Sequence, residues 1–182
     1  MFPRKLEGGI ELQLCGVPHA PRLFALMERN RESLSQWLPW IHATHGVADV
    51  AAFLHRAQAQ FDGGDGFHAG IFVEGEVAGF IGLHRIDWAN QSVEIGYWLD
   101  AGYRGRGVMT AAVRGVVEIC FEHYRLHRVE IRCGVENTES CAIPERLGFR
   151  LEGVLRQAQW VMGRALDLRV YSKLAWEWNS PP

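Results

Sequence analysis

The sequence predicts a single α/β domain of the α+β kind spanning residues 1–182, with a central mixed, mostly antiparallel sheet of about seven strands flanked by about four helices. Three observations predict it. Three short strand patterns separated by tight turns lie between residues 67 and 99, which is typical of an antiparallel meander. A long helical pattern then joins the last of them to a further strand, which must therefore lie parallel to it. Two amphipathic helical patterns precede the meander, and two long strand patterns end the chain.

The amino-terminal part of the chain is predicted to hold one strand and two helices. Gly9–Cys15 alternates apolar and polar residues, as a half-buried strand does. The helical run Pro18–Leu34 begins with two prolines, which suit the first turn of a helix. Val47–Phe61 carries a second apolar stripe at helical spacing. Between the helices, Trp37-Leu38-Pro39-Trp40 is interpreted as an aromatic cluster in a loop.

The middle of the chain is predicted to form the meander and the longest helix. The expected strands are Phe67–Val73, Val77–Ile86 and Ser92–Leu99. A hairpin turn is expected at Glu74-Gly75-Glu76, where glycine adopts a positive φ at little cost. The strongest helical pattern runs from Arg104 to Tyr124 and has two glycines at its amino end.

The last third of the chain is predicted to close the sheet. The strand Arg128–Val135 should pair in parallel with the third meander strand. Asn137 is a good N-cap for a short helix that ends at Leu147-Gly148-Phe149, and Pro144 is expected to kink or shorten that helix. The two final strands are expected at Leu151–Met162 and Leu168–Trp176, joined by a turn at residues 163–165.

Composition excludes several classes of protein. The formal net charge is −2 and the chain has no basic stripe, which argues against nucleic-acid binding and against binding to an acidic membrane. No stretch reaches the apolar length of a signal peptide or a membrane span, so a cytoplasmic protein is expected. His42 and His45 have no cysteine or carboxylate partner nearby, and no metal site is expected. The cysteines lack paired spacing and are expected to be reduced thiols: Cys15, Cys120, Cys133 and Cys141.

The segment Arg104-Gly105-Arg106-Gly107 predicts an anion site. It leads directly into the strongest helical pattern, where backbone amides without helical partners can converge on one phosphate group. The segment lacks the Gly-Lys-Ser/Thr end of a P-loop, and Thr110 stands where a dinucleotide-binding fingerprint needs a third small residue. These residues by themselves leave open which anion is bound.

The order of elements, together with four pieces of sequence, resembles the GNAT family of acetyl-coenzyme A-dependent N-acetyltransferases. The pieces are VEIGYWLD, YRGRGVMT, NTESCAIPERLGF and LEGVLRQAQW, and within the family they resemble the RimJ/RimL-type branch, which includes acetyltransferases of ribosomal-protein amino termini. The resemblance implies a GNAT fold with two splayed parallel strands, acetyl-coenzyme A as co-substrate and no metal. The residues that it implies for the coenzyme are Tyr97, Trp98, Leu99, Arg104, Gly105, Arg106, Gly107, Val108, Met109, Thr110, Asn137 and Ser140.

The same resemblance suggests catalytic candidates and one absence. Many family members use a tyrosine in the Asn-initiated helix as the acid, and Pro144 stands at that position here. Ser140 is the first candidate for hydrogen bonding to the coenzyme thiol. Glu94 is either a base or an ion-pair partner of an arginine on the neighbouring strand. Gln159 stands where RimL-type sequences commonly carry a glutamate, so it can only orient the amine or a water molecule.

The acceptor is expected to be an amine of low pKa. With unperturbed values, an α-amino group is neutral in roughly one molecule in seven at pH 7, whereas a lysine amine is neutral in about one in 2,500. A site with a weakened base therefore favours a protein amino terminus. Trp37, Trp40 and Trp160 could form an aromatic wall of the acceptor site. A proton relay through His68 and His84 is a further reading, although packing or surface roles are favoured for both.

Two other functions remain open at this point. The acceptor could be a small amine such as a polyamine or an antibiotic. The missing tyrosine and the glutamine at position 159 also fit a non-catalytic module that binds coenzyme A. The apolar, aromatic-rich strands at the carboxyl terminus could bury a homodimer contact.

Overall fold

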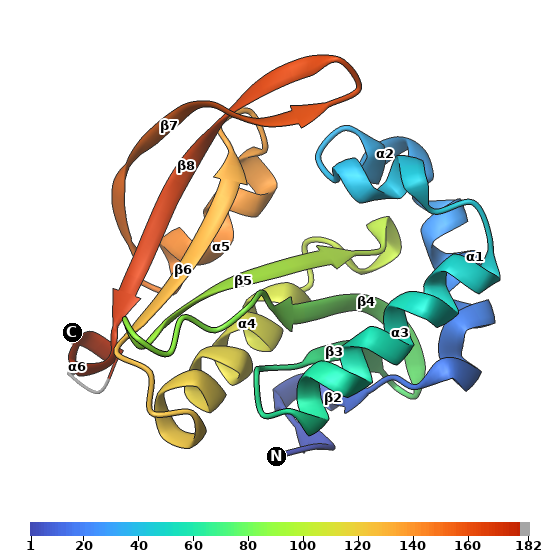
Figure 1. Cartoon of the computed structure of the whole chain (residues 1–182), viewed down its shortest axis with the longest axis horizontal. Coiled ribbons are helices and arrows are strands. Elements are labelled where there is room, and N and C mark those ends of the chain that lie inside the picture. Colours follow the sequence, from blue (N-terminus) through green and yellow to red (C-terminus); the bar gives the residue numbers. More distant parts are fainter. Residues whose placement is uncertain (179–182) are drawn as a thin grey trace.

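The protein is built around one eight-stranded sheet, seen in a computed structural model that describes residues 1–178 (Figure 1). The strand order is β1-β2-β3-β4-β5-β6-β8-β7, and every neighbouring pair is antiparallel except β5 and β6. The strands are β1 (Arg4–Lys5), β2 (Ile10–Leu14), β3 (His68–Val73), β4 (Glu76–Leu83), β5 (Ser92–Leu99), β6 (Arg128–Gly134), β7 (Arg150–Val161) and β8 (Arg164–Leu174).

Helices cover both faces of this sheet. The α-helices are α1 (Ala20–Arg29), α2 (Arg31–Ser35), α3 (Val47–Asp62), α4 (Val108–Glu118), α5 (Thr138–Arg146) and α6 (Ala175–Trp178). A π-helical turn, Ile119–His123, continues α4. Short 3-10 turns lie at Glu7–Gly9, Val17–His19, Pro39–Ala43 and Ala101–Tyr103.

Alternation along the strands separates two hydrophobic cores. On one face, Val93 and Ile95 of β5 pack in a cluster with residues of α4 and α5, such as Val116. On the other face, Trp98 of β5 lies in a second cluster with α1, α2 and α3, to which Leu54 belongs. The even-numbered residues of β5 therefore face α1–α3, and the odd-numbered ones face α4 and α5.

The parallel pair at the middle of the sheet separates after three residues. Ser92, Val93 and Glu94 of β5 pair with residues 128–130 of β6. Beyond these residues, β5 and β6 no longer pair with each other. Figure 1 shows β5 and β6 diverging from that point. The predicted splayed parallel pair is thus present, and it divides the sheet into an amino-terminal and a carboxyl-terminal half.

Several predicted boundaries were wrong. The strand β1 was not predicted and raises the strand number to eight. The expected helix Pro18–Leu34 breaks at Asn30, whose buried side chain donates to Leu26 O and accepts from Ala101 N. Asn30 thereby ties the end of α1 to the segment after β5.

The expected helix from Arg104 begins only at Val108. Gly105 and Gly107 have φ values of 70° and 76°, which are left-handed and cannot continue an α-helix. The last strand also begins earlier than predicted, at Arg164, because Met162 and Gly163 form a tight turn with positive φ. It ends at Leu174, where the chain becomes helical.

The strand β7 is irregular near the expected site. Leu155 pairs with Leu168 and Gln159 with Leu166, so four steps along β7 match two steps along β8. This bulge contains Gln157, with a φ of 49°, whose amide donates to the Asp167 carboxylate at 2.7 Å. Bulges of this kind redirect side chains and bend the strand. In Figure 1 the β7–β8 hairpin curves toward α2.

Candidate active site

The loop before α4 has the geometry of an anion site. Ala111 N donates to Gly107 O at 3.0 Å, which is the bond that opens the helix, so the amides of Val108, Met109 and Thr110 precede any helical partner. These amides lie at the positive end of the helix dipole. A Cβ atom added at Gly105 or Gly107 would meet no heavy atom within 4 Å, so the loop is open on the side where a ligand would approach.

Cationic side chains surround this loop. Arg146 donates to Thr110 Oγ1 at 2.8 Å, and Arg104 pairs with Glu139 at 3.1 Å. The guanidinium of Arg106 lies over the ring of Tyr103 at 5.3 Å. Free amides and guanidinium groups together match the donor set that a pyrophosphate requires. The predicted coenzyme loop therefore fits the group assigned to it.

The separation of β5 and β6 exposes backbone next to this loop. On one edge, Trp98 and Leu99 pair with Phe80 and Gly79 of β4. Their other edge faces β6, with which pairing has ended at Glu94. Ligands of open α/β sheets commonly bind beyond the carboxyl ends of parallel strands, where backbone groups become available.

Tyr97, Cys133 and Ser140 meet where the two strands diverge. Ser140 Oγ lies 3.3 Å from Cys133 Sγ and 3.4 Å from Tyr97 Oη. Ser140 N donates to Asn137 Oδ1 at 3.2 Å, so Asn137 is the N-cap of α5, as predicted. Burial raises the pKa of Tyr97 well above its usual value, and a hydrogen bond with Cys141 followed by burial raises the pKa of Cys133. Both groups therefore keep their protons at neutral pH.

Pro144 lies inside α5, and of the two predicted effects, a kink or a shortening of the helix, the shortening does not occur. A proline has no N–H, so the carbonyl of Ser140 loses its helical donor. The hydroxyl of Tyr97 takes that place and donates to Ser140 O at 3.1 Å. The helix continues through Pro144 to Arg146, and Gly148, with a φ of 68°, follows its end. A tyrosine hydroxyl thus reaches α5 from β5, although none is present at position 144.

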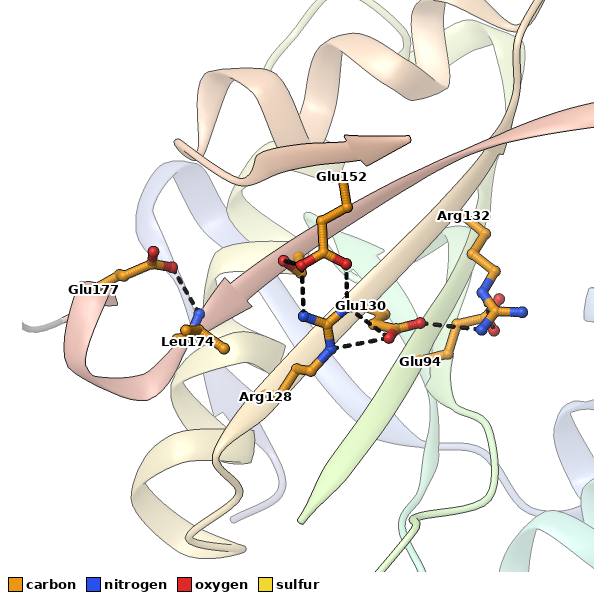
Figure 2. Close-up of polar contacts among 8 residues, drawn as sticks. Glu94, Arg128, Glu130, Arg132, Glu152, Leu174 and Glu177 are labelled. Carbon is orange, nitrogen blue, oxygen red and sulfur yellow. Dashed lines mark hydrogen bonds and ion pairs between the residues drawn. The ribbon is translucent and has the colours of Figure 1, made fainter. Parts of the chain in front are cut away.

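Glu94 ends a row of ion pairs that runs along β6 (Figure 2). Its carboxylate lies 3.3 Å from Arg132 Nε, and Arg132 also pairs with Glu130 at 3.1 Å. Glu130 pairs with Arg128 at 2.7 Å, and Arg128 reaches Glu152 at 2.5 Å. As predicted, Glu94 points away from the core that Val93 and Ile95 enter, and of its two predicted roles the structure displays the ion pair.

A cavity of about 690 Å³ lies on the α3 face of the splayed strands. Glu94, Tyr97 and Ser140 line it, so it opens directly onto the cluster described above. The remaining walls come from α1, α3, the segment after α2, β3, β4, β6, β7 and β8. Phe53 and Arg56 of α3 are lining residues that the sequence did not single out, because helical spacing alone does not show which partner a helix faces.

The three tryptophans predicted for the acceptor wall fall in two places. Trp37 and Trp40 line the cavity, and the ring of Trp37 packs against the position of Gly134, where an added Cβ would lie 3.2 Å away. Trp160 is 66% exposed and is not among the lining residues. Strand alternation explains the difference, because Gln159 points into the cavity and its neighbour points away from it.

Gln159 of β7 forms the part of the cavity wall next to Trp37. Its side-chain amide donates to the backbone oxygen of Trp37 at 2.6 Å, which joins β7 to the segment after α2. The bulge at residues 156–158 gives Gln159 this direction. The structure thus gives Gln159 a defined hydrogen-bond partner in the wall of the cavity.

Two histidines lie in this part of the molecule. His68 and His84 both line the cavity, together with Gly82 and Gly96. Burial, followed by the charge of His84, lowers the pKa of His68 to about 4. The sequence analysis favoured packing or surface roles for both, because their spacing does not reveal a shared cavity.

Fold and site together define a GNAT acetyltransferase. The model of the acetyltransferase (GNAT) domain matches residues 13–150, which is most of the chain, and the chain belongs to this family of N-acetyltransferases.

Among its relatives is the "Putative ribosomal N-acetyltransferase YdaF" of Bacillus subtilis (strain 168), 36% identical over 181 residues and covering 98% of each chain. The ribosomal-protein-serine acetyltransferase of Escherichia coli (strain K12) is 29% identical over 170 residues, covering 93% of this chain and 95% of its own. A solved structure of RimL, a ribosomal L7/L12 alpha-N-protein acetyltransferase in complex with coenzyme A, aligns with a TM-score of 0.89 at 26% identity, covering 93% of this chain and 98% of that one. These similarities agree with the predicted RimJ/RimL-type resemblance.

Residues 1–178 contain neither a candidate membrane span nor a candidate metal site. Within residues 1–178, no helix combines the length and the apolar character needed to cross a membrane. The same residues contain no group of three or more histidine, cysteine or acidic side chains arranged to hold a metal ion.

Proposed function

We propose that this protein transfers an acetyl group from acetyl-coenzyme A to the α-amino group of a protein amino terminus, by direct attack within a ternary complex. One observation carries the proposal: the anion loop follows the end of β5, and the cavity is lined by Tyr97 of the same strand and by Ser140, where β5 and β6 have diverged. A donor bound from one side and an acceptor bound from the other would meet there. Such positioning removes much of the entropic cost of a two-substrate reaction.

The residues named for the coenzyme divide the binding task. The amides of the Arg104–Thr110 loop and the nearby guanidinium groups would hold its pyrophosphate, and the open edge of Tyr97–Leu99 would hold its extended arm. Acetyl-coenzyme A supplies the activated acetyl group as a thioester. A backbone amide of Tyr97–Leu99 would stabilise negative charge on the carbonyl oxygen.

Ser140 and Tyr97 form the acid side of this site. Ser140 Oγ, which in the structure donates to Tyr97 Oη at 3.4 Å, would turn its proton to the departing thiolate, while the Tyr97 hydroxyl holds the backbone of Ser140 by donating to its carbonyl oxygen at 3.1 Å. Because the Tyr97 pKa is raised, this hydroxyl remains a donor through the neutral range. The site thus contains a tyrosine hydroxyl, that of Tyr97, although position 144 holds a proline.

The choice of an α-amine rests on chemistry and on similarity. Gln159 cannot accept a proton, which disfavours alkyl amines, whose neutral fraction at pH 7 is far smaller than that of α-amines. YdaF is named a putative ribosomal N-acetyltransferase, the second relative a ribosomal-protein-serine acetyltransferase, and RimL a ribosomal L7/L12 alpha-N-protein acetyltransferase. An amino terminus could enter between Trp40 and Phe53, which line the cavity. A cytoplasmic location is part of this proposal.

Acceptor profiling tests the proposal. Purified protein with labelled acetyl-coenzyme A would be offered peptides beginning with serine or alanine, matched peptides with a blocked amino terminus, spermidine and aminoglycosides. We expect label on the free-terminus peptides and none on the blocked ones. Turnover confined to the small amines would reassign the acceptor, and tight coenzyme binding without release of thiol to any amine would indicate a non-catalytic module.

A further inference from the structure

Two imidazole rings lie over a row of glycines on the cavity face of the sheet. His68 of β3 pairs with Gly82 of β4, and Gly82 pairs with Gly96 of β5, so these three positions form one row across the strands. A Cβ at Gly82 would lie 2.1 Å from His68 Nδ1, and a Cβ at Gly96 would lie 2.7 Å from His84 Nε2. Each ring therefore occupies space that only glycine leaves free, and the two rings line the same cavity.

The two histidines differ in their surroundings. The ring of His68 is stacked against Phe80 at 6.2 Å and meets Phe53 edge-on at 5.1 Å. With its pKa lowered to about 4, His68 is neutral at physiological pH. His84 is exposed and lies beside Gly96, the residue before Tyr97. His84 is thus the imidazole that water and an incoming amine can reach.

The other charged groups of the cavity are already engaged. Asp49 of α3 accepts the amides of His45 and Gly46, at 2.8 and 3.0 Å. Glu94 of β5 pairs with Arg132 of β6 at 3.3 Å. The remaining ionisable groups of the lining are Arg56, which cannot act as a base, and the protonated Tyr97 and Cys133.

We propose that His84 is the general base that removes a proton from the acceptor amine, directly or through one water molecule, and that His68 is a positioning residue beneath it. This role rests on the proposed function. The ammonium gives one proton to His84, which passes it to solvent. The neutral nitrogen then forms the C–N bond as the C–S bond breaks, and the second proton of the nitrogen balances the one taken up by the thiolate.

The arrangement separates the two proton transfers across β5. His84 stands over Gly96 on the α3 face, whereas the hydroxyl of Tyr97 reaches Ser140 of α5. An amine in the cavity would therefore meet a proton acceptor on its own side and a donor for the leaving sulfur on the other.

The pH dependence of kcat/KM in the His84→Gln variant tests this role. With a peptide α-amine as acceptor, we expect a loss of up to about sevenfold at pH 7, because roughly one α-amine in seven is already neutral there. The loss should shrink toward pH 9, where an amine with a pKa of about 7.8 deprotonates without help. Affinity for acetyl-coenzyme A, measured by calorimetry, should be unchanged. His55→Gln, on the exposed side of α3, is the matched control and should retain wild-type kcat/KM.

A second variant keeps the imidazole and moves it. Gly96→Ala places a methyl group 2.7 Å from the present position of His84 Nε2, which is too close for both to stay, so the ring must move and the variant should reproduce the pH-dependent loss. Full activity of His84→Gln at every pH, or a loss that does not change with pH, would overturn the role of His84 while leaving acetyl transfer in place. A wild-type protein that acetylates no amine would overturn both proposals.

Discussion

Tyr97 is the residue whose role in the site depends most on a distant neighbour. Its hydroxyl donates to the carbonyl that Pro144 leaves without a helical partner, and it contacts the side chain of Ser140 on the same turn. One side chain thus supports the helix and orients the proposed thiolate donor. The proline that removes the usual acid position also creates the acceptor that holds Tyr97.

A double-mutant cycle measures this link. Tyr97→Phe should lower the free energy of unfolding by about 1 kcal/mol, because a carbonyl oxygen loses its hydrogen bond. In a Pro144→Ala background the backbone amide of residue 144 can donate to Ser140 O, so the same change should cost less. Urea unfolding of the four proteins gives both values. An equal cost in the two backgrounds would show that the Ser140 carbonyl does not need Tyr97.

Sequence reasoning reached Ser140 but not the Tyr97 hydroxyl. Asn137 marks a helix start within a few residues of Ser140, so the position of Ser140 follows from local rules. The contact between Tyr97 and Ser140 spans 43 residues and depends on how far β5 and β6 diverge. No local pattern reports such a distance.

The start of α4 is the element on which donor binding should depend. Its open loop and free amides need a positive φ at Gly107, and the space beyond Gly107 is empty of protein atoms. A side chain there would therefore strain the backbone and enter the anion site without striking the rest of the fold.

Two substitutions at Gly107 separate these effects. Gly107→Ala adds only backbone strain and should weaken acetyl-coenzyme A binding moderately. Gly107→Glu adds a carboxylate at the anion site and should abolish measurable binding. Calorimetry on both proteins checks the difference, with circular dichroism as the control for folding. Equal affinities of the two variants for acetyl-coenzyme A would show that this loop does not bind the phosphate groups of the coenzyme.

The elements themselves were predictable, and their ends often were not. Amphipathic spacing located α3 and the meander because burial on one face sets those patterns. The break at Asn30 depends on its bond to Ala101, 71 residues away. The early start of β8 depends on a turn at Met162, a residue type that ordinarily avoids positive φ. Tertiary contacts decided both cases.

At the scale of the whole molecule, His68 couples stability to pH. Its folded pKa of about 4 lies below the usual 6.5, so the unfolded chain binds more protons between these values. The contribution of His68 to stability should be constant above pH 6.5 and should fall as the pH drops toward 4, by at most about 1.4 kcal/mol per unit. The depressed pKa of Glu152, at about 2 because of Arg128, acts only at lower pH.

Urea unfolding at pH 7 and pH 5 checks this expectation. The wild type should lose stability between these values, and His68→Gln should lose less, because glutamine does not titrate. His55→Gln should behave like the wild type. A His68→Gln protein with the full wild-type pH dependence would place the titrating group elsewhere.

The cavity wall at Gln159 and Trp37 joins parts of the chain that are synthesised at very different times. Gln159 bonds to Trp37 across 122 residues, and β8 inserts between β6 and β7. During synthesis from the amino terminus, β6 therefore has no partner on its outer edge until residues 164–174 emerge. The cavity is completed almost last, so a nascent chain could bury its amino-terminal core well before this cavity formed.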